Sequence, residues 1–230
     1  MNQRHRFLGS ATWSELWDRT PRPLLAVPIG SCEQHGPHLP LDTDTRIAVA
    51  LAQGLTDAFE PGDVMVAPPL TVSASGEHQG FPGTLSIGVE ATELMLVELV
   101  RSADWSAGVV FVNGHAGNDA PVRRAVSRLE AEGRRAMAWW PRVRGGDAHA
   151  GETETSLMLA IAPDLVRAER TAGRTEPLAD LIEELRANGV RPVSPNGVLG
   201  DPREASDVHG RALLTRLVVD LVAAVDEWWR

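Results

Sequence analysis

The sequence LLAVPIGSCEQHGPHLPLDTD, residues 24–44, joins a short apolar run to a polar loop rich in His, Asp and Glu. The apolar run, Leu24 to Ile29, is bounded by Pro and Gly and has the length of a buried β-strand. After the loop, apolar residues recur at helical spacing over residues 45–59, and Asp44 or Thr45 is predicted to be the N-cap of that helix. We expect this order of strand, loop and helix to recur along the rest of the chain.

The remainder of the chain continues this alternation of strands and helices. Short apolar runs predict strands, and longer stretches with apolar residues three and four apart predict helices. The alternation is typical of an α/β fold with a mostly parallel sheet. No internal repeat, low-complexity tract or linker is present, so we predict one domain over residues 1–230. Further strands are expected at residues 64–67, 108–112 and 136–140, and further helices at residues 90–102, 119–132, 152–162, 177–188 and 207–228.

Composition narrows the possible functions. The 22 basic and 31 acidic side chains give a net charge of −9, which argues against a large nucleic-acid-binding face. No apolar run approaches the roughly 18 residues of a membrane-spanning helix, and residues 1–15 lack the apolar stretch of a signal peptide, so we expect a cytoplasmic protein without membrane contact. All basic residues are Arg and there is no Tyr, which leaves neither lysine nor tyrosine for catalysis.

The loop of residues 30–44 contains the first candidate site. Glu33 and His35 are two residues apart, so they point the same way in extended backbone, and Asp44 returns at the start of the following helix. A carboxylate, an imidazole and a second carboxylate suit Zn, Mn or Fe(II). The alternative is a hydrogen-bonded loop with a capping aspartate. A metal site explains His35 in this loop better than a nucleophilic role for Cys32 does.

A second cluster, VFVNGHAGND at residues 110–119, also follows a predicted strand. Its glycines allow a tight turn around His115, a candidate metal ligand. Asn113 and Asn118 are candidates to orient His115 or to bind a substrate carbonyl. The alternative is that Asn-Gly here is only a common turn signal.

A third cluster, GGDAHAGETETS at residues 145–156, combines His149 with glutamates at the start of a predicted helix. Glu154 shares a helix face with Leu157 and Met158, and a carboxylate on a buried face requires a metal or an arginine beside it. His149 lies in the preceding loop and can reach the same site. Alternatively, the glutamates are ordinary first-turn acids favoured by the helix dipole.

Together the three clusters offer more ligands than a single catalytic zinc ordinarily takes. Two metal ions that share one carboxylate would use all of them, and such a pair polarises a carbonyl and lowers the pKa of a bound water. His149, which is then not needed as a ligand, would transfer the proton. The predicted ligands are Glu33, His35, Asp44, His115 and Glu154.

Four motifs carry a resemblance to a known family: GSCEQHGPHLPLDTD (30–44), GEHQGFPGT (76–84), VNGHAGN (112–118) and HAGETETS (149–156). In residue type, order and spacing they resemble the creatininase family, whose members are dinuclear metal amidohydrolases with a three-layer α/β/α fold. The stretches DTDTRIA, GGDAHAGETETS and GVLGDPREA are similar to the mycofactocin-system branch of that family. Members of that branch are peptidases, which release a cyclised Val-Tyr-derived unit from the C-terminus of a modified ribosomal precursor peptide.

The resemblance implies a role for each of the predicted site residues. Glu33, Asp44 and His115 would bind one metal ion. His35 and a further glutamate would bind the other, with Asp44 bridging the two ions. His149 matches the histidine that transfers the proton in the family.

The chain departs from the family pattern at one position. In creatininases the loop reads like NGHYEN and its Glu is a metal ligand, whereas this chain has Gly117 there. Glu154 is expected to replace it as a ligand and to take part in catalysis, and the same departure weakens creatinine as a substrate. Glu77 and His78 lie in a segment that resembles one beside the substrate in the family, so they are expected to bind substrate. The alternative is that they are simply polar loop residues.

The sequence therefore predicts a metal-dependent peptide hydrolase with two divalent ions per subunit, Zn or Fe(II) in first place and Mn as a further option. Its expected partner is the modified precursor peptide. Two alternatives stay open: hydrolysis of a small cyclic amide or formamide, and a non-catalytic metal-binding subunit of a peptide-modification complex. The family forms homo-oligomers, so Trp228 and Trp229, at the end of the last helix, are expected to pack against another subunit.

Overall fold

The computed structural model describes residues 6–230, and at its centre is a sheet of four parallel strands in the order β2-β1-β3-β4. In the strand register, Leu24 lies beside Val64 on one side and Gly108 on the other. The strands are short and largely apolar, as expected when helices cover both faces of a parallel sheet. All four predicted strands are present: β1 (Leu24–Ile29), β2 (Val64–Val66), β3 (Gly108–Asn113) and β4 (Ala136–Trp139).

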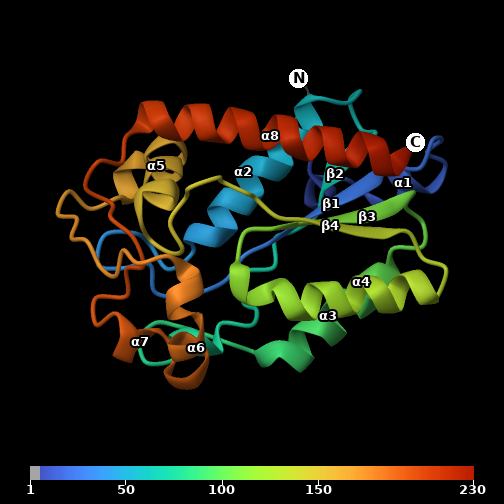
Figure 1. Ribbon diagram of the computed structural model, residues 1–230. Helices are drawn as coiled ribbons and strands as arrows, with labels where there is room; N and C mark the ends of the chain where they lie inside the picture. Colours follow the sequence, from blue (N-terminus) through green and yellow to red (C-terminus); the bar gives the residue numbers. More distant parts are fainter. Residues whose placement is uncertain (1–5) are drawn as a thin grey trace.

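Helices lie on both faces of this sheet, which confirms the prediction of a three-layer α/β/α fold (Figure 1). One face is covered by α2 and α8, with α5 packed against them, and the other face is covered by α3 and α4. The bounds of these helices agree with the predictions to within two residues. They are α2 (Thr43–Asp57), α3 (Gly88–Ser102), α4 (Asp119–Ala131), α5 (Glu152–Ile161) and α8 (Asp207–Trp229).

The alternation of side chains along β1 supplies both cores. Leu24 and Ala26 pack with α2, α5 and α8, whereas Leu25, Val27 and Ile29 pack with α3 and α4. Successive side chains of a strand point to opposite faces of the sheet, so a wholly buried strand is apolar at every position. The loop that follows Ile29 therefore begins at the end of a strand that packs against helices on both faces of the sheet.

The start of α2 differs from the sequence prediction. The helix begins at Thr43 with Asp42 at its N-cap, so the prediction that Asp44 or Thr45 caps this helix is wrong. Asp44 lies in the first turn, where its carboxylate is buried and accepts a hydrogen bond from Ser31 Oγ at 2.8 Å. The carboxylate is therefore directed into the interior and away from the helix end.

Two short helices are not predicted from the sequence, because five and four residues are too few to show a helical period. They are α1 (Trp13–Trp17) and α7 (Val190–Val193). The predicted helix over residues 177–188 is present as α6 (Leu178–Asn188), which packs with α7 through a small apolar cluster of its own. Short 3-10 turns complete the described chain: η2 (Leu8–Ser10), η3 (Gly76–His78), η4 (Ala116–Asn118) and η5 (Pro163–Leu165).

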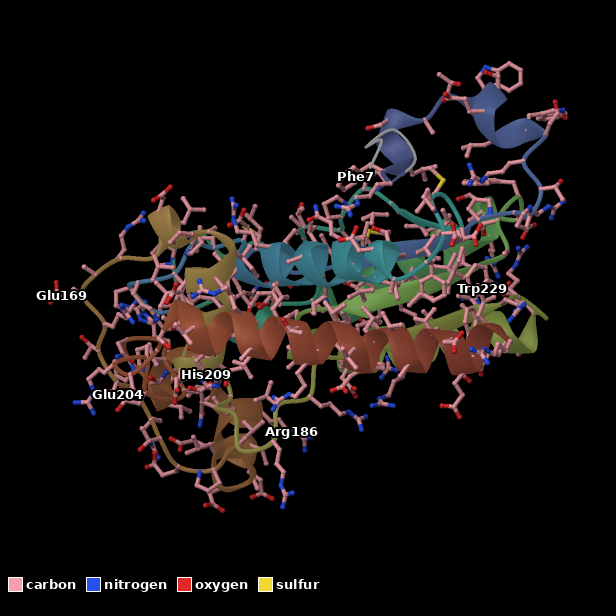
Figure 2. All side chains as sticks on the ribbon, turned by 90° about the horizontal axis from the view of Figure 1, so that it is seen from above. Phe7, Glu169, Arg186, Glu204, His209 and Trp229 are labelled. Atoms are coloured by element: carbon pink, nitrogen blue, oxygen red, sulfur yellow. The ribbon has the colours of Figure 1, made fainter. Side chains whose placement is uncertain are left out.

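The long helix α8 runs along one face of the molecule, with His209 near its first turn and Trp229 at its opposite end (Figure 2). The Trp229 ring packs against Phe59 with ring centres 5.6 Å apart, and the Arg135 guanidinium lies 5.0 Å from the centre of the Trp228 ring. Both indoles thus have partners within the chain, and their contact with another subunit stays a prediction. None of the helices within residues 6–230 has the length and apolarity needed to span a membrane.

Candidate metal centre

Polar side chains from several loops meet at one edge of the sheet, because parallel strands all end on the same side. The loops after β1, β3 and β4 contribute to this cluster, and α2 and α5 add residues from their first turns. The structure thereby brings together residues that are more than a hundred positions apart in the sequence. The side chains that meet are Glu33, His35, Asp44, His115, His149 and Glu154.

Glu33, Asp44 and His115 form a first donor group. His115 Nδ1 lies 3.2 Å from Glu33 Oε1 and 3.1 Å from Asp44 Oδ2, and all three side chains are buried. One donor atom of each residue lies within 4.8 Å of the other two. Within residues 6–230, neither carboxylate oxygen of Glu33 has a well-formed hydrogen bond. A buried carboxylate in that state needs a compensating cation, so the group fits a divalent metal ion.

His35, Asp44 and Glu154 form a second donor group. His35 Nε2 lies 3.0 Å from Asp44 Oδ1 and 3.9 Å from Glu154 Oε2, and the donor atoms again lie within 4.8 Å of one another. The Glu154 carboxylate is fixed by the backbone N–H of Ala150, which donates to Oε2 at 2.6 Å. Asp44 takes part in both groups through different oxygens, which is the position a bridging carboxylate requires.

Three buried histidines share one pattern of orientation. In each, one ring nitrogen donates to a backbone carbonyl and the other ring nitrogen faces the carboxylates. A carbonyl oxygen can only accept, so the bonded nitrogen carries a hydrogen and the opposite nitrogen is left to bind a metal ion or a further proton. Proteins orient metal-binding histidines in this way. The bonds are His35 Nδ1 to the Glu33 carbonyl (3.1 Å), His115 Nε2 to the Ala74 carbonyl (2.9 Å) and His149 Nε2 to the Gln34 carbonyl (2.8 Å).

For the two histidines of the donor groups, the neighbouring charges shift the pKa by more than burial does. Burial would lower the pKa of His35, but Asp44 raises this pKa to about 10. Glu33 and Asp44 likewise raise the pKa of His115 well above its ordinary value, against the effect of burial. Burial would raise the pKa of Glu33, but the neighbouring charge of His115 lowers it to about 2. Without a metal ion, the carboxylates hold protons on both histidines, and metal binding there must release protons.

The pKa values of Glu154 and His149 are shifted in the opposite sense. Burial raises the pKa of Glu154 to about 7. Burial, together with the charges of His35 and His78, lowers the pKa of His149 well below its ordinary value. His149 Nδ1 lies 3.9 Å from Glu33 Oε1. The neutral His149 imidazole therefore presents a nitrogen to the cluster that can accept a proton.

The turn η3 brings Glu77 and His78 to the same cluster. Glu77 Oε1 lies 3.5 Å from His115 Nε2, and His78 Nε2 lies 3.4 Å from Glu33 Oε1. His78 is buried, whereas 36% of the Glu77 side chain is exposed. The two predicted substrate-binding residues thus lie directly beside the candidate metal ligands, with Glu77 on the open side.

Gly117 provides the space that the Glu77 side chain fills. A Cβ atom at position 117 would lie 2.2 Å from Glu77 Oε1 and 2.3 Å from His115 Nε2. Both distances are far shorter than any contact between non-bonded heavy atoms. The carboxylate of Glu77 therefore occupies the space into which a side chain at position 117 would project.

Asn113 and Asn118 lie beside His115, and their amide groups are bonded within the protein. Asn113 Nδ2 donates to the His115 carbonyl at 2.7 Å. Asn118 Oδ1 accepts from the backbone N–H of Ala74 at 3.2 Å, and its Nδ2 donates to the Gly30 carbonyl at 3.3 Å. The two amides hold the loop that carries His115, and their contact with substrate stays a prediction.

Gln34 is a residue of the site that the sequence interpretation missed. Its side-chain NH₂ group donates to His78 Nδ1 at 2.8 Å and to the Gly197 carbonyl at 3.0 Å. Its side-chain oxygen accepts from the backbone N–H of Gly36 at 2.9 Å. This buried amide fixes His78 and connects the cluster to a distant loop. The sequence feature that could have identified Gln34 is its position between two predicted ligands in the motif EQH.

A cavity of about 440 Å³ lies over this cluster, and we call it the first cavity. Its polar side includes Glu33, Asp44 and His115. Apolar side chains of α6 and α7 line another part of it. A volume of this size suits a small-molecule ligand or a short segment of a larger one. The apolar side chains are Leu178, Ile182, Leu185 and Val190.

Comparison with known proteins identifies a family that matches nearly the whole chain. The model of the creatininase family, described as creatinine amidohydrolase, matches residues 9–225. The chain belongs to the creatininase family. Membership confirms the prediction of a creatininase-family hydrolase, and the matched range contains every residue of both donor groups.

Relatives within the creatininase family match nearly the full chain. The mycofactocin precursor peptide peptidase of Mycobacterium ulcerans (strain Agy99) is 48% identical, over 96% of this chain and 91% of its own. The protein of the same name from Mycobacterium tuberculosis (strain CDC 1551 / Oshkosh) is 49% identical with the same coverage. A solved structure described as "Creatininase Mn" has a TM-score of 0.80 and 25% identity, covering 97% of this chain and 98% of its own.

Proposed function

We propose that this chain is a peptidase of mycofactocin biosynthesis, which uses two divalent metal ions to hydrolyse a peptide bond in a modified precursor peptide. The observation that carries the chemistry is the pair of buried donor groups that share Asp44. The substrate is proposed from the relatives at 48% and 49% identity, both named mycofactocin precursor peptide peptidase.

The two donor groups would each hold one metal ion. Glu33, Asp44 and His115 would bind the first ion, and His35, Asp44 and Glu154 would bind the second. Imidazole and carboxylate donors suit Zn, Fe(II) or Mn, and a manganese form of creatininase is among the similar structures. When bound, the ions would polarise the substrate carbonyl and make water at the site more acidic.

His149 is proposed to transfer the proton from water to the leaving amine. Its Nε2 is engaged by the Gln34 carbonyl, so Nδ1 is the nitrogen available for proton exchange. That nitrogen faces Glu33, on the cluster side of the ring. Because its lowered pKa keeps the imidazole neutral, His149 can accept a proton before it donates one. Glu154, with its pKa raised to about 7, is proposed to assist as well as to bind metal.

Glu77 and His78 are proposed to contact the substrate beside the scissile carbonyl. Glu77 is the partly exposed carboxylate of the cluster, and His78 is held in place by Gln34. For Asn113 and Asn118 we propose a positioning role, because their amides hold the His115 loop.

The released unit is proposed to be the cyclised, Val-Tyr-derived C-terminus of the precursor. The first cavity supports this proposal, because apolar side chains of α6 and the carboxylates and histidines of the cluster line the same space of about 440 Å³. A short, largely apolar unit would bury its surface against those apolar side chains while its carbonyl reaches the cluster.

Mass spectrometry of the metal-loaded protein with the modified precursor peptide tests this function. We expect release of the C-terminal unit, its loss on chelation and its recovery when metal is restored. The unmodified peptide and creatinine serve as matched substrates. Turnover of creatinine alone, or no cleavage by protein shown to contain two metal ions, would overturn the peptidase assignment.

A further inference from the structure

A second cavity, of about 620 Å³, adjoins the first cavity. Ala148, Leu178 and Leu199 line both of them, so the two cavities are neighbours across a short shared wall. Residues 143–148 and 199–201 form much of the second cavity, together with the beginning of α8. None of the proposed metal ligands lines it.

Unpaired arginines surround these two cavities. Most arginines within residues 6–230 have an ion-pair or hydrogen-bond partner, but four have none among the described residues: Arg142, Arg144, Arg186 and Arg216. Arg144 and Arg216 line the second cavity, and Arg186 lines the first. Three of these four arginines therefore line a cavity.

The carboxylates of the second cavity are, in contrast, all engaged by other groups. One caps the start of α5, one pairs with a histidine, and two pair with arginines outside the cavity. Each carboxylate thus has a hydrogen-bond or ion-pair partner, whereas Arg144 and Arg216 have none among the described residues. The contacts are Asp147 Oδ1 with the Thr153 N–H (3.1 Å), Glu152 with His209 Nδ1 (3.0 Å), Glu176 with Arg174 (2.9 Å) and Asp201 with Arg203 (2.6 Å).

Arg144 and Arg216 are therefore the charged side chains of this cavity whose hydrogen-bond donors are unused, in a chain with a net charge of −9. A guanidinium group binds a carboxylate through two parallel hydrogen bonds and does so more specifically than an ammonium group. Two such groups on one cavity therefore favour a ligand that carries carboxylates.

We propose that the second cavity binds acidic side chains of the substrate peptide, in the residues that precede the cleaved bond, through Arg144 and Arg216. This inference rests on the proposed peptidase function. The released unit is short and occupies the first cavity, so the longer remainder of the peptide must lead away from the metal centre. The second cavity begins at the shared wall and provides that path.

Fluorescence anisotropy with the full-length, metal-loaded protein tests the inference separately from cleavage. Two labelled peptides have the same length and end in Val-Tyr, and the preceding residues contain either two Glu or two Gln. We expect the Glu peptide to bind about tenfold more tightly at low salt, with the difference shrinking as salt screens the charges. Arg144→Gln with Arg216→Gln should remove the preference. The matched control is Arg211→Gln, also on α8, which pairs with Asp207 outside the cavity.

A charge reversal separates direct binding from a structural effect. Arg216→Glu should weaken binding of the Glu peptide and strengthen binding of a peptide with two Lys at the same positions. Equal affinity of the native protein for the Glu and Gln peptides would overturn the inference, as would an equal loss in Arg211→Gln. Failure to cleave the modified precursor would instead overturn the peptidase function, while a retained preference for Glu would still support the acid-binding cavity.

Discussion

The first and second cavities share Ala148, Leu178 and Leu199, but their charged side chains differ in burial and in the partners they have. In the first cavity, carboxylates and histidines are buried and lie within 3 to 4 Å of one another. In the second, Arg144 and Arg216 are exposed and have no partner among the described residues. Electrostatic interactions are strong in a buried site and are screened at an exposed one. Changes in the first cavity should therefore affect catalysis severely, whereas changes in the second should tune recognition.

The largest effect is expected when a carboxylate of the first cavity loses its charge. Glu33→Gln keeps the size of the side chain but removes a ligand, so we expect kcat to fall by more than about a thousandfold. Metal analysis should show fewer ions bound per chain. The control is Glu169→Gln, because Glu169 is exposed and belongs to neither donor group. Full activity and unchanged metal content in Glu33→Gln would remove Glu33 from the metal centre.

A change at His149 should separate proton transfer from metal binding. His149→Gln retains a donor for the Gln34 carbonyl and removes the ring nitrogen that faces the cluster. We expect kcat to fall by about a hundredfold while the metal content stays the same. Loss of metal in this variant would instead make His149 a ligand, since it also lies near Glu33 and His35.

A single methyl group at Gly117, which lines the first cavity, should displace a neighbouring side chain of the candidate metal centre. The new Cβ of Gly117→Ala would overlap Glu77 Oε1 and His115 Nε2, so one of these side chains must move. We expect metal affinity to fall by about tenfold to a hundredfold, as when a group that orients a ligand is lost. Gly76→Ala is the matched control, because a Cβ there meets no atom within 4 Å. Similar affinities of the two variants would show that Gly117 does not set the position of His115.

The sequence was sufficient to predict the strands and to identify the polar loops whose side chains meet in the candidate metal centre, because both depend on local patterns. Each strand is an apolar run bounded by turn residues, and Glu33 and His35 come directly after β1. Parallel strands then bring the loops to one edge whatever lies between them.

What the sequence could not predict depends on contacts between distant residues. Gly117 and Glu77 are forty positions apart, and only the folded chain shows that one fills the space left by the other. Gln34 bonds His78 and Gly197, which are 44 and 163 positions away in the sequence. The second cavity was missed for the same reason, since its arginines stand out by their lack of partners in space.

The smallest expected effect concerns stability against pH, and it again distinguishes the two cavities. The pKa of His35 rises from 6.5 to about 10 on folding, so its stabilising contribution is complete below pH 6.5 and is lost as pH rises towards 10. The pKa of Glu33 falls from 4.5 to about 2, so its contribution is present above pH 4.5 and is lost only as pH falls towards 2. Between pH 7 and 10 the change at His35 therefore dominates.

Metal-free protein should accordingly lose about 5 °C of its thermal midpoint between pH 7 and 10, as measured by scanning fluorimetry after chelation. Metal-loaded protein should lose less, because the ions replace the protons that the carboxylates hold on His35 and His115. The Arg144→Gln and Arg216→Gln double variant should follow the same two curves, since guanidinium groups do not titrate in this range. Identical pH profiles with and without metal would mean that metal does not bind where those protons are held. A changed profile in the arginine variant would mean that the two cavities are electrostatically coupled, against the division between buried chemistry and exposed recognition.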